Sequence, residues 1–326
     1  MGQSENHLPV YLDQNAFSAL QQGKTEQPEL LEILKALSKS GAIYIYSMVH
    51  VEECRASSRP KEFAAIIDDL PAYLIEPSKL TSGNLTLVPN RARELILAKP
   101  DITDQATKVI EDLVRMFQFT AGWLGQLKAH QLMEEVVRNM DHFWSIAKAD
   151  VPDDFHFLLQ DSRNEMADTI GDIPLGKYKC ETELWQSKLR DRLPRNYAQL
   201  DDMPAEDVVT FIISCFDNPE QKEIRKQFPK NFWSKLDNRE EGKMVGFAFM
   251  LFMAGLIRDS RVKKKDRKRR ERHFLAQFRD CQHIENASYC VAFVTFDKGA
   301  ARLAKSAYSY AGVATEVVHL TAKNPK

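Results

Sequence analysis

Four acidic residues lie far apart in the chain, each beside a stretch with the pattern of a strand. Asp13 follows the apolar run PVYL, and Asp297 comes directly after the run VAFVTF. Glu53 lies early in a helical segment that follows the run AIYIY, and Asp280 lies on the predicted helix that precedes VAFVTF. Because α/β folds build their sites at the carboxyl ends of parallel strands, we expect these four carboxylates to converge there.

Converging carboxylates require a cation between them. At separations of about 4 to 5 Å and an effective dielectric constant of about 20, they repel one another by a few kcal/mol per pair. Mg²⁺ and Mn²⁺ are the expected partners, because both prefer oxygen ligands and keep bound waters. One ion can lower the pKa of a bound water and orient it toward a phosphodiester, and a second can neutralise charge on the leaving oxygen. The predicted chemistry is metal-assisted hydrolysis of a phosphodiester bond by one or two ions.

The N-terminal elements that must position these acids alternate between strand and helix. Residues 9–12 and 42–46 are rich in β-forming residues, and the segment 28–41 between them has an amphipathic helical pattern that ends at a glycine. The apolar positions of that segment are Leu30, Ile33, Leu34 and Leu37. Two strands joined through a helix predict a βαβ unit in a parallel sheet.

The C-terminal part returns to the same alternation. The pattern predicts an amphipathic helix over 272–289, a buried strand at 291–296, a helix over 298–310 and a last strand at 315–320. The predicted inward stripe of the first helix consists of Phe274, Leu275, Phe278 and Cys281. These elements would complete the sheet that the N-terminal part begins.

The middle of the chain has long helical segments and no convincing strand. Residues 103–117 place Ala106, Val109, Ile110, Leu113 and Phe117 on one face. Residues 204–216 begin with a proline followed by acidic residues, which is typical of a helix start.

The predicted fold class is therefore α/β, with a helical middle region that splits the sheet in sequence. Residues 1–79 and 241–326 would form one discontinuous domain around a central, mostly parallel sheet, and 80–240 an all-helical insertion.

The bulk properties predict a cytoplasmic protein outside the membrane. The net charge is −1, and the five cysteines are widely spaced without a CxxC pair, which is typical of reduced thiols. The N-terminus MGQSENHLPV lacks the basic start and apolar core of a secretory signal. The most apolar stretch, 244–257, is shorter than the roughly 20 residues that span a bilayer and is interpreted as a buried core helix.

Four stretches together resemble the motifs of PIN-domain ribonucleases, and more closely PIN-like prokaryotic proteins with large insertions. They are VYLDQNAF, YSMVHVEEC, FRDCQHIENASYC and FVTFDKGAARLA, each supplying one acid of the set Asp13, Glu53, Asp280 and Asp297. The resemblance implies a three-layer PIN-like fold and a divalent-metal-dependent endoribonuclease. It also implies that the four acids are both the metal ligands and the catalytic residues.

The resemblance also assigns supporting residues. Ser47 would open the second-motif helix six positions before the acid, which favours Glu53 over Glu52, and Thr295 would belong to a Thr-x-Asp motif. His283 lies one turn from Asp280 on the same helix face.

Alternatives to these assignments stay open. Asp13 could be a turn residue, Asp280 a surface acid and Asp297 a loop acid. Asn15 could hold a metal-bound water or cap the first helix, with a slight preference for the cap. The Thr295 side chain could bond a carboxylate or a water, or pack its methyl group in the core; His50 and His283 are more typical of satisfied histidines than of ligands.

One segment is strongly cationic although the whole chain is nearly neutral. Residues 261–272, RVKKKDRKRRER, contain nine basic and two acidic residues. Contacts to phosphate would favour nucleic acid through counterion release, and the lack of interleaved aromatics argues for backbone attraction rather than base reading. The predicted nucleic-acid-binding residues are Arg261, Lys263, Lys264, Lys265, Arg267, Lys268, Arg269, Arg270 and Arg272. A solvated helix or a loop is the competing interpretation.

The leading functional hypothesis is an endoribonuclease. Its biological role is open between a toxin or antiphage effector and a processing enzyme. A non-catalytic scaffold of PIN-like fold is the first rival. A single-strand or structure-specific DNA nuclease is the second, because no residue pattern reads the 2′-hydroxyl of RNA. The predicted partners are RNA or single-stranded DNA, and a regulatory protein or a second copy of the chain bound through the helical insertion.

Overall fold

A computed structural model describes most of the chain, and two compact units can be distinguished. Unit 1 consists of residues 1–98, 193–258 and 277–326, and unit 2 of residues 99–192 and 259–276. The described residues are 8–19, 28–75, 87–98, 112, 115–116, 119, 128–149, 152–177, 179–180, 203–235, 239–254, 256 and 267–321.

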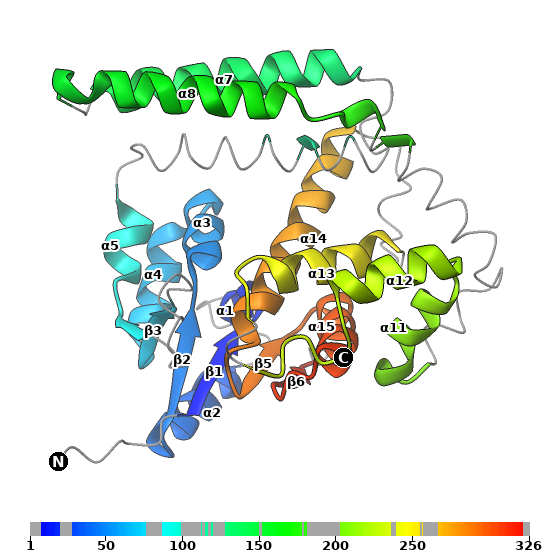
Figure 1. Cartoon of the computed structure of the whole chain (residues 1–326). Coiled ribbons are helices and arrows are strands. Elements are labelled where there is room, and N and C mark those ends of the chain that lie inside the picture. The colour runs from blue at the N-terminus through cyan, green and yellow to red at the C-terminus, as the bar shows by residue number, and fades with distance from the viewer. Residues whose placement is uncertain are drawn as a thin grey trace. The chain divides into compact units, whose positions relative to one another are not determined.

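Unit 1 contains a six-stranded sheet in the order β4-β3-β2-β1-β5-β6 (Figure 1). Every neighbouring pair is parallel except β3 and β4, which are antiparallel. The strands are β1 (Leu8–Leu12), β2 (Ala42–Tyr46), β3 (Ala72–Ile75), β4 (Leu87–Pro89), β5 (Ala292–Thr295) and β6 (Glu316–His319). The α/β class with a mostly parallel sheet is thereby confirmed.

Strand β1 lies at the centre of the sheet, between β2 and β5. Val10 is in register with Tyr44 on one side and with Ala292 on the other. All five residues of β2 are buried, which is why this strand has a continuous apolar run rather than an alternating one. The pairing brings the ends of an early strand and a late strand of the chain together.

The helices of unit 1 surround this sheet and come from both ends of the chain. Helices α1, α3, α4 and α5 contribute to a core cluster that also contains Tyr44 and Val294. Helix α14 begins in unit 2 and continues into unit 1 from residue 277. The helices are α1 (Gln14–Ala19), α2 (Pro28–Lys39), α3 (Met48–Ala56), α4 (Pro60–Asp68), α5 (Ala92–Leu97), α11 (Ala205–Ser214), α12 (Asn218–Gln227), α13 (Lys243–Met253), α14 (Arg267–Ala287) and α15 (Lys298–Ala311).

Helix α13 is the buried core helix predicted from its apolar sequence, and a carboxylate from α14 holds its start. Glu285 accepts hydrogen bonds from the backbone N–H groups of Gly242 (2.8 Å), Met244 (2.9 Å) and Val245 (3.0 Å). These donors are among the N–H groups that have no partner within a helix. None of the helices in the described part of the chain is long and apolar enough to cross a membrane.

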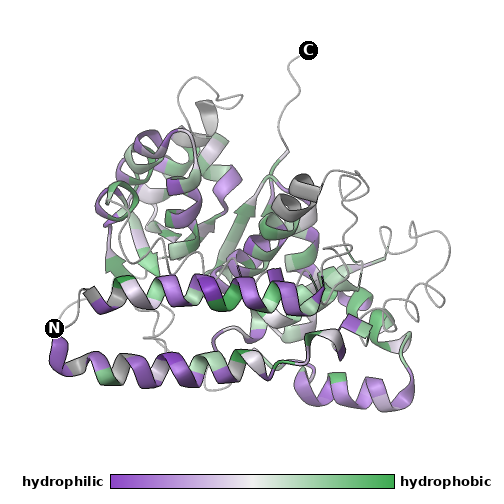
Figure 2. Ribbon diagram, turned by 90° about the horizontal axis from the view of Figure 1, so that it is seen from above, coloured by the Kyte–Doolittle hydropathy of each residue, from purple (hydrophilic) through white to green (hydrophobic). Residues whose placement is uncertain are grey.

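Unit 2 contains two long paired helices, α7 (Ala129–Ala149) and α8 (His156–Gly171). The short 3-10 helix η2 (Asp153–Phe155) directly precedes α8. Figure 2 shows hydrophilic and hydrophobic residues alternating along both helices. A core cluster of this unit consists of Met116, Phe119, Leu132, Val136, Met140, Ile170 and Leu175, of which three lie on α7 and Ile170 lies on α8. Helix α7 therefore buries one stripe of residues four positions apart, as expected of an amphipathic helix.

The structure differs from the sequence predictions in several places. Strand β4 lies within 80–240, where no strand is predicted; it has only three residues, too few to show an alternating pattern, and it pairs at the sheet edge. In α2, Leu34 is buried, but Ile33 and Leu37 are exposed, so only part of the predicted apolar face faces the core. Helix α11 is observed where 204–216 predicts it and contacts α15 within unit 1. Most of 103–117 lies outside the described residues, and the boundaries at 79/80 and 240/241 stay predictions.

Candidate active site

The candidate site lies at the carboxyl ends of β1 and β5. Asp13 directly follows β1, and its backbone N–H donates to the Val294 carbonyl (2.9 Å). The Asp13 side chain is buried, and its Oδ2 accepts a hydrogen bond from Thr295 Oγ1 (2.7 Å). Of the two interpretations for Thr295, the bond to a carboxylate is therefore the observed one.

Thr295 also connects Asp13 to the acid of the fourth motif. The backbone N–H of Asp297 donates to Thr295 Oγ1 (2.9 Å), so the hydroxyl accepts from one acid's backbone and donates to the other acid's side chain. Asp297 is the N-cap of α15, and its Oδ1 accepts from the N–H groups of Gly299 (2.6 Å) and Ala300 (2.9 Å). Asp297 Oδ1 therefore caps α15, and these hydrogen bonds hold the Asp297 carboxylate beside the end of β5.

The preference for Asn15 as a helix cap is wrong. Helix α1 begins at Gln14, and Asp13 supplies the carbonyl that accepts from the Ala16 and Phe17 N–H groups. Asn15 lies inside the helix, and its Oδ1 accepts from the backbone N–H of Phe296 (3.0 Å). Its side chain therefore fastens α1 to the end of β5, next to Asp13.

Glu53 reaches the same region from α3. Its Oε2 lies 3.0 Å from Nε2 of His283, and the same nitrogen lies 3.8 Å from Oδ1 of Asp13. One imidazole nitrogen therefore lies between two carboxylates from different elements. This contact gives Glu53, rather than its neighbour Glu52, a place at the site, because adjacent helical residues point about 100° apart.

A buried hydrogen-bond network behind the carboxylates orients His283. Its Nδ1 lies 2.7 Å from the hydroxyl oxygen of Tyr11, which in turn lies 2.9 Å from Ser47 Oγ. Ser47 occupies the predicted N-cap position of α3. The sequence interpretation missed Tyr11. No sequence pattern distinguishes a tyrosine that hydrogen-bonds to site residues from one that only packs in the core of an apolar strand.

His50 is a satisfied buried histidine, as its sequence context indicated. Its Nδ1 accepts from the backbone N–H of Ser47 (3.0 Å), which places the ring proton on Nε2, where it donates to the Leu12 carbonyl (2.7 Å). Both backbone groups are fixed, so His50 is held in its neutral form. The rings of His50 and His283 are 4.6 Å apart.

Burial and charge shift the pKa values of these groups in opposite directions. Burial raises the pKa of Asp13 above its ordinary value, and the nearby His283 and the Thr295 hydroxyl only partly offset it. Burial lowers the pKa of His283, but the carboxylates of Glu53 and Asp13 outweigh burial, and the net pKa is raised. For His50, burial and the adjacent His283 both act against the charged form and bring the pKa well below its ordinary value.

Asp280 lies on α14 one turn before His283. Its Oδ2 accepts a hydrogen bond from Gln277 Nε2 (2.9 Å) on the same helix. The contacts described above connect Asp13, Glu53 and Asp297 through Thr295 and His283, whereas Asp280 is placed near them by its position on α14. Its role as a fourth ligand stays a prediction.

The predicted basic segment is described only in part. Arg261, Lys263, Lys264 and Lys265 lie outside the described residues. The remaining basic residues lie on the first turns of α14; they are Arg267, Lys268, Arg269, Arg270 and Arg272. Their side chains are not described, so phosphate binding by this segment stays a prediction.

The donor chemistry of the site fits a hard divalent cation. Asp13, Glu53 and Asp297 supply carboxylate oxygens, which Mg²⁺ and Mn²⁺ prefer. The carboxylates of Asp13 and Glu53 also share a single imidazole nitrogen, so a group able to carry positive charge already lies between them. Within the described residues, no three side chains of His, Cys, Asp or Glu form a ready-made metal-binding group.

Three comparisons with known proteins give no match. No family model, no curated protein and no solved structure matches the chain. The functional interpretation therefore depends on the residues and contacts of this chain and on the motif resemblance.

Proposed function

We propose that this protein is a divalent-metal-dependent nuclease that hydrolyses phosphodiester bonds, with RNA as the preferred substrate. The observation that carries the proposal is the meeting of Asp13 and Glu53 at one nitrogen of His283, with Asp297 joined to Asp13 through Thr295. The PIN-like three-layer fold with a large helical insertion, and the preference for RNA over DNA, come from the motif resemblance and belong to the same proposal.

In this proposal Asp13, Glu53 and Asp297 hold the metal, and Asp280 completes the set from α14. When bound, Mg²⁺ or Mn²⁺ supplies a water of lowered pKa and neutralises charge at the phosphate. Thr295 keeps Asp13 at the carboxyl edge through its 2.7 Å hydrogen bond. His283 orients Glu53 through the 3.0 Å contact and is itself held by the Tyr11 hydroxyl. The chain thereby fixes the oxygens that must hold the cation.

The test is cleavage of end-labelled single-stranded RNA by purified protein with Mg²⁺ or Mn²⁺. Wild type should cut the RNA, chelation with EDTA should stop cleavage, and added Mn²⁺ should restore it. Asp13→Asn and Asp297→Asn should each lower the cleavage rate by about 100-fold or more, because each removes a charged ligand.

The matched control is Asp69→Asn, which makes the same chemical change at an exposed residue after α4. It should cut at the wild-type rate. Equal cleavage by wild type, Asp13→Asn and Asp69→Asn would refute the proposed site. A parallel assay with single-stranded DNA of the same sequence decides between RNA and DNA.

A further inference from the structure

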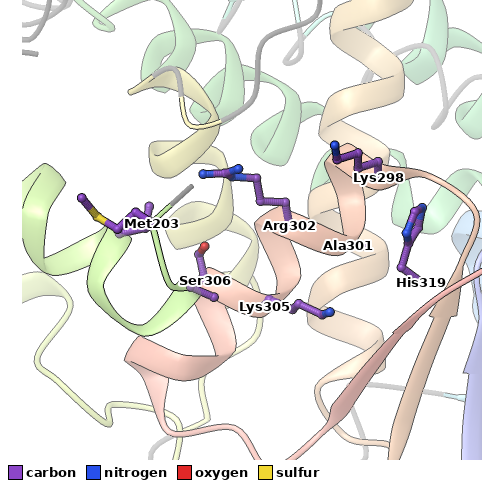
Figure 3. Close-up of a pocket in the computed structure, with 9 residues that line it drawn as sticks. Met203, Lys298, Ala301, Arg302, Lys305, Ser306 and His319 are labelled. Carbon is purple, nitrogen blue, oxygen red and sulfur yellow. The ribbon is translucent and has the colours of Figure 1, made fainter. Parts of the chain in front are cut away.

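A second candidate site is a basic pocket between α11, α15 and β6, all in unit 1. It has a volume of about 270 Å³ (Figure 3). The lining residues are Met203, Ala205, Val208, Lys298, Ala301, Arg302, Lys305, Ser306 and His319. Pockets for drug-sized ligands start at about 300 Å³, so this one suits a smaller group.

Helix α15 supplies the charge of this pocket from one face. Lys298, Arg302 and Lys305 are four and three residues apart, which places them along one side of a helix over about 10 Å. In Figure 3 the Arg302 side chain extends toward Met203, and the Lys305 side chain extends toward the β6 side, where His319 lies. Among the described residues that line the pocket, none is acidic. The pocket therefore has positive charge at both ends and attracts anions.

Ser306 gives an independent indication of a ligand. Its side chain is completely buried, and within the described part of the chain its hydroxyl has no hydrogen-bond partner. A buried hydroxyl without a partner lowers stability, so it requires an explanation. Figure 3 shows the hydroxyl oxygen directed toward the space between Met203 and Arg302. A hydrogen-bond acceptor in the pocket would satisfy it.

The pocket begins one residue after the candidate active site. Asp297 is the N-cap of α15, and Lys298 is the first residue of that helix. The two hydrogen bonds from Gly299 and Ala300 to the Asp297 carboxylate fix the start of the helix, and with it the position of Lys298 and Arg302 relative to Asp297. A carboxylate of the candidate site and the first pocket residue of α15 are therefore neighbours in the chain at one helix end.

We propose that this pocket binds backbone phosphate of the nucleic-acid strand next to the bond that is cut. Arg302 and Lys305 contact phosphate oxygens, the Ser306 hydroxyl donates a hydrogen bond to one of them, and Val208 with Ala301 contacts the adjoining sugar. Charge-assisted hydrogen bonds of this kind are the usual protein contacts to phosphate. The inference rests on the proposed nuclease function for the identity of the ligand, but not for the binding itself.

The experiment measures binding without cleavage. A 5′-fluorescein-labelled single-stranded RNA 12-mer is titrated with the full chain in EDTA, by fluorescence anisotropy, at several salt concentrations. The double variant Arg302→Ala/Lys305→Ala should bind about tenfold more weakly or worse. The slope of log affinity against log salt should fall by about 1.4, since each lost phosphate contact in a single strand contributes about 0.7.

The matched control removes two exposed lysines from α12, in Lys222→Ala/Lys226→Ala. It should bind within about twofold of wild type, because it removes the same charge elsewhere in unit 1. Lys305→Ala alone, an exposed position, provides a second pocket variant in case the double variant does not fold. Equal binding by the pocket variants and the control overturns the proposal.

Ser306→Ala separates hydrogen bonding from charge. The variant should bind the RNA several-fold more weakly with an unchanged salt slope, because a hydroxyl is neutral. Unchanged affinity would show that Ser306 does not contact the RNA and would overturn that part of the proposal. Inorganic phosphate and a nucleoside monophosphate are tested as competitors. Tight binding of either without binding of the 12-mer makes the pocket a small-molecule site and overturns the strand proposal.

The outcomes separate this proposal from the proposed function. If the 12-mer binds through the pocket but Mn²⁺ brings no cleavage, the pocket stands and the nuclease function fails. If Mn²⁺ brings cleavage while the pocket variants bind like the control, the nuclease function stands and the pocket fails.

Discussion

Two buried carboxylates of unit 1 have different surroundings, although burial raises the pKa of both. Glu285 on α14 accepts hydrogen bonds from three backbone N–H groups at the start of α13. Asp13 has one backbone donor, Gln14 N–H, while its other close partners are the Thr295 hydroxyl and the His283 ring. The two acids thus differ in what compensates their charge.

This difference indicates which acid is structural. The backbone partners of Glu285 belong to one helix start and cannot turn away, so its oxygens are committed. The side-chain partners of Asp13 come from β5 and α14, so a ligand can replace them at the carboxylate without breaking a backbone hydrogen bond. A carboxylate held by backbone N–H groups stabilises the fold, whereas a carboxylate whose partners are mainly side chains is compatible with a binding site.

The largest expected effect on stability comes from Glu285→Gln. The amide cannot accept all three backbone hydrogen bonds and leaves at least one buried N–H without a partner, so the free energy of unfolding should fall by about 2 to 4 kcal/mol. Urea denaturation followed by circular dichroism measures the loss.

Asp13→Asn is the matched amide replacement for that experiment. Its free energy of unfolding should fall by only about 1 kcal/mol, because burial already opposes the Asp13 charge and the amide oxygen can still accept from Thr295; the one bond lost is that from the part-buried Gln14 N–H. Equal losses in the free energy of unfolding in the two variants would contradict the distinction between backbone partners and side-chain partners.

A smaller effect concerns pH and the two neighbouring histidines, whose rings meet edge to face. The pKa of His50 is lowered on folding, so its contribution to stability is complete above the ordinary histidine pKa of about 6.5 and is lost as the pH falls below it. The pKa of His283 is raised, so its contribution is complete below about pH 6.5 and does not mask the loss. His50 should therefore lower the free energy of unfolding by up to about 1.4 kcal/mol per pH unit below pH 6.5.

His50→Gln tests this sign. A glutamine at the third position of α3 can still accept the Ser47 N–H, as in a capping box, but does not titrate. Its unfolding free energy, measured in urea from pH 7.5 to 5.0, should fall less steeply than that of wild type. An identical pH dependence of the two proteins would show that His50 is not held neutral.

The smallest expected effect is a gain in stability in Ser306→Ala. Removing a buried hydroxyl without a partner, in favour of the best helix former, should raise the free energy of unfolding by about 0.5 to 1 kcal/mol. Thermal unfolding should show a slightly higher Tm in the absence of nucleic acid. A lower Tm would indicate that the hydroxyl has a structural partner.

The sequence predicts the β2-β1-β5-β6 side of the sheet better than the β4-β3 side. Strands β1, β2, β5 and β6 are found where apolar runs predict them. Strand β4 was not predicted because three residues are too few for the period of two to be distinguished from a turn of helix. Strand β3 was not predicted either, although with four residues it is as long as β5 and β6.

The site could be predicted in its residues but not in its contacts. Strand ends place Asp13 and Asp297, and the N-cap places Glu53 on its helix. The hydrogen bond from Thr295 to Asp13 joins residues 282 positions apart, and only the observed pairing of β1 with β5 reveals it. The basic stripe of α15 follows helical spacing, but a charged helix face is usually solvated, and only the neighbouring α11 and β6 make it a pocket.

The central position of β1 has a consequence for synthesis of the chain on the ribosome. Its partner β5 is translated some 280 residues later, so the sheet centre cannot close until nearly the whole chain has emerged. Until then Asp13 lacks the Thr295 hydroxyl, and the acid of the fourth motif does not yet exist. Interrupted translation products therefore carry Asp13 and Glu53 without Thr295 and Asp297, and the candidate site is assembled only after β5 and the start of α15 have been made.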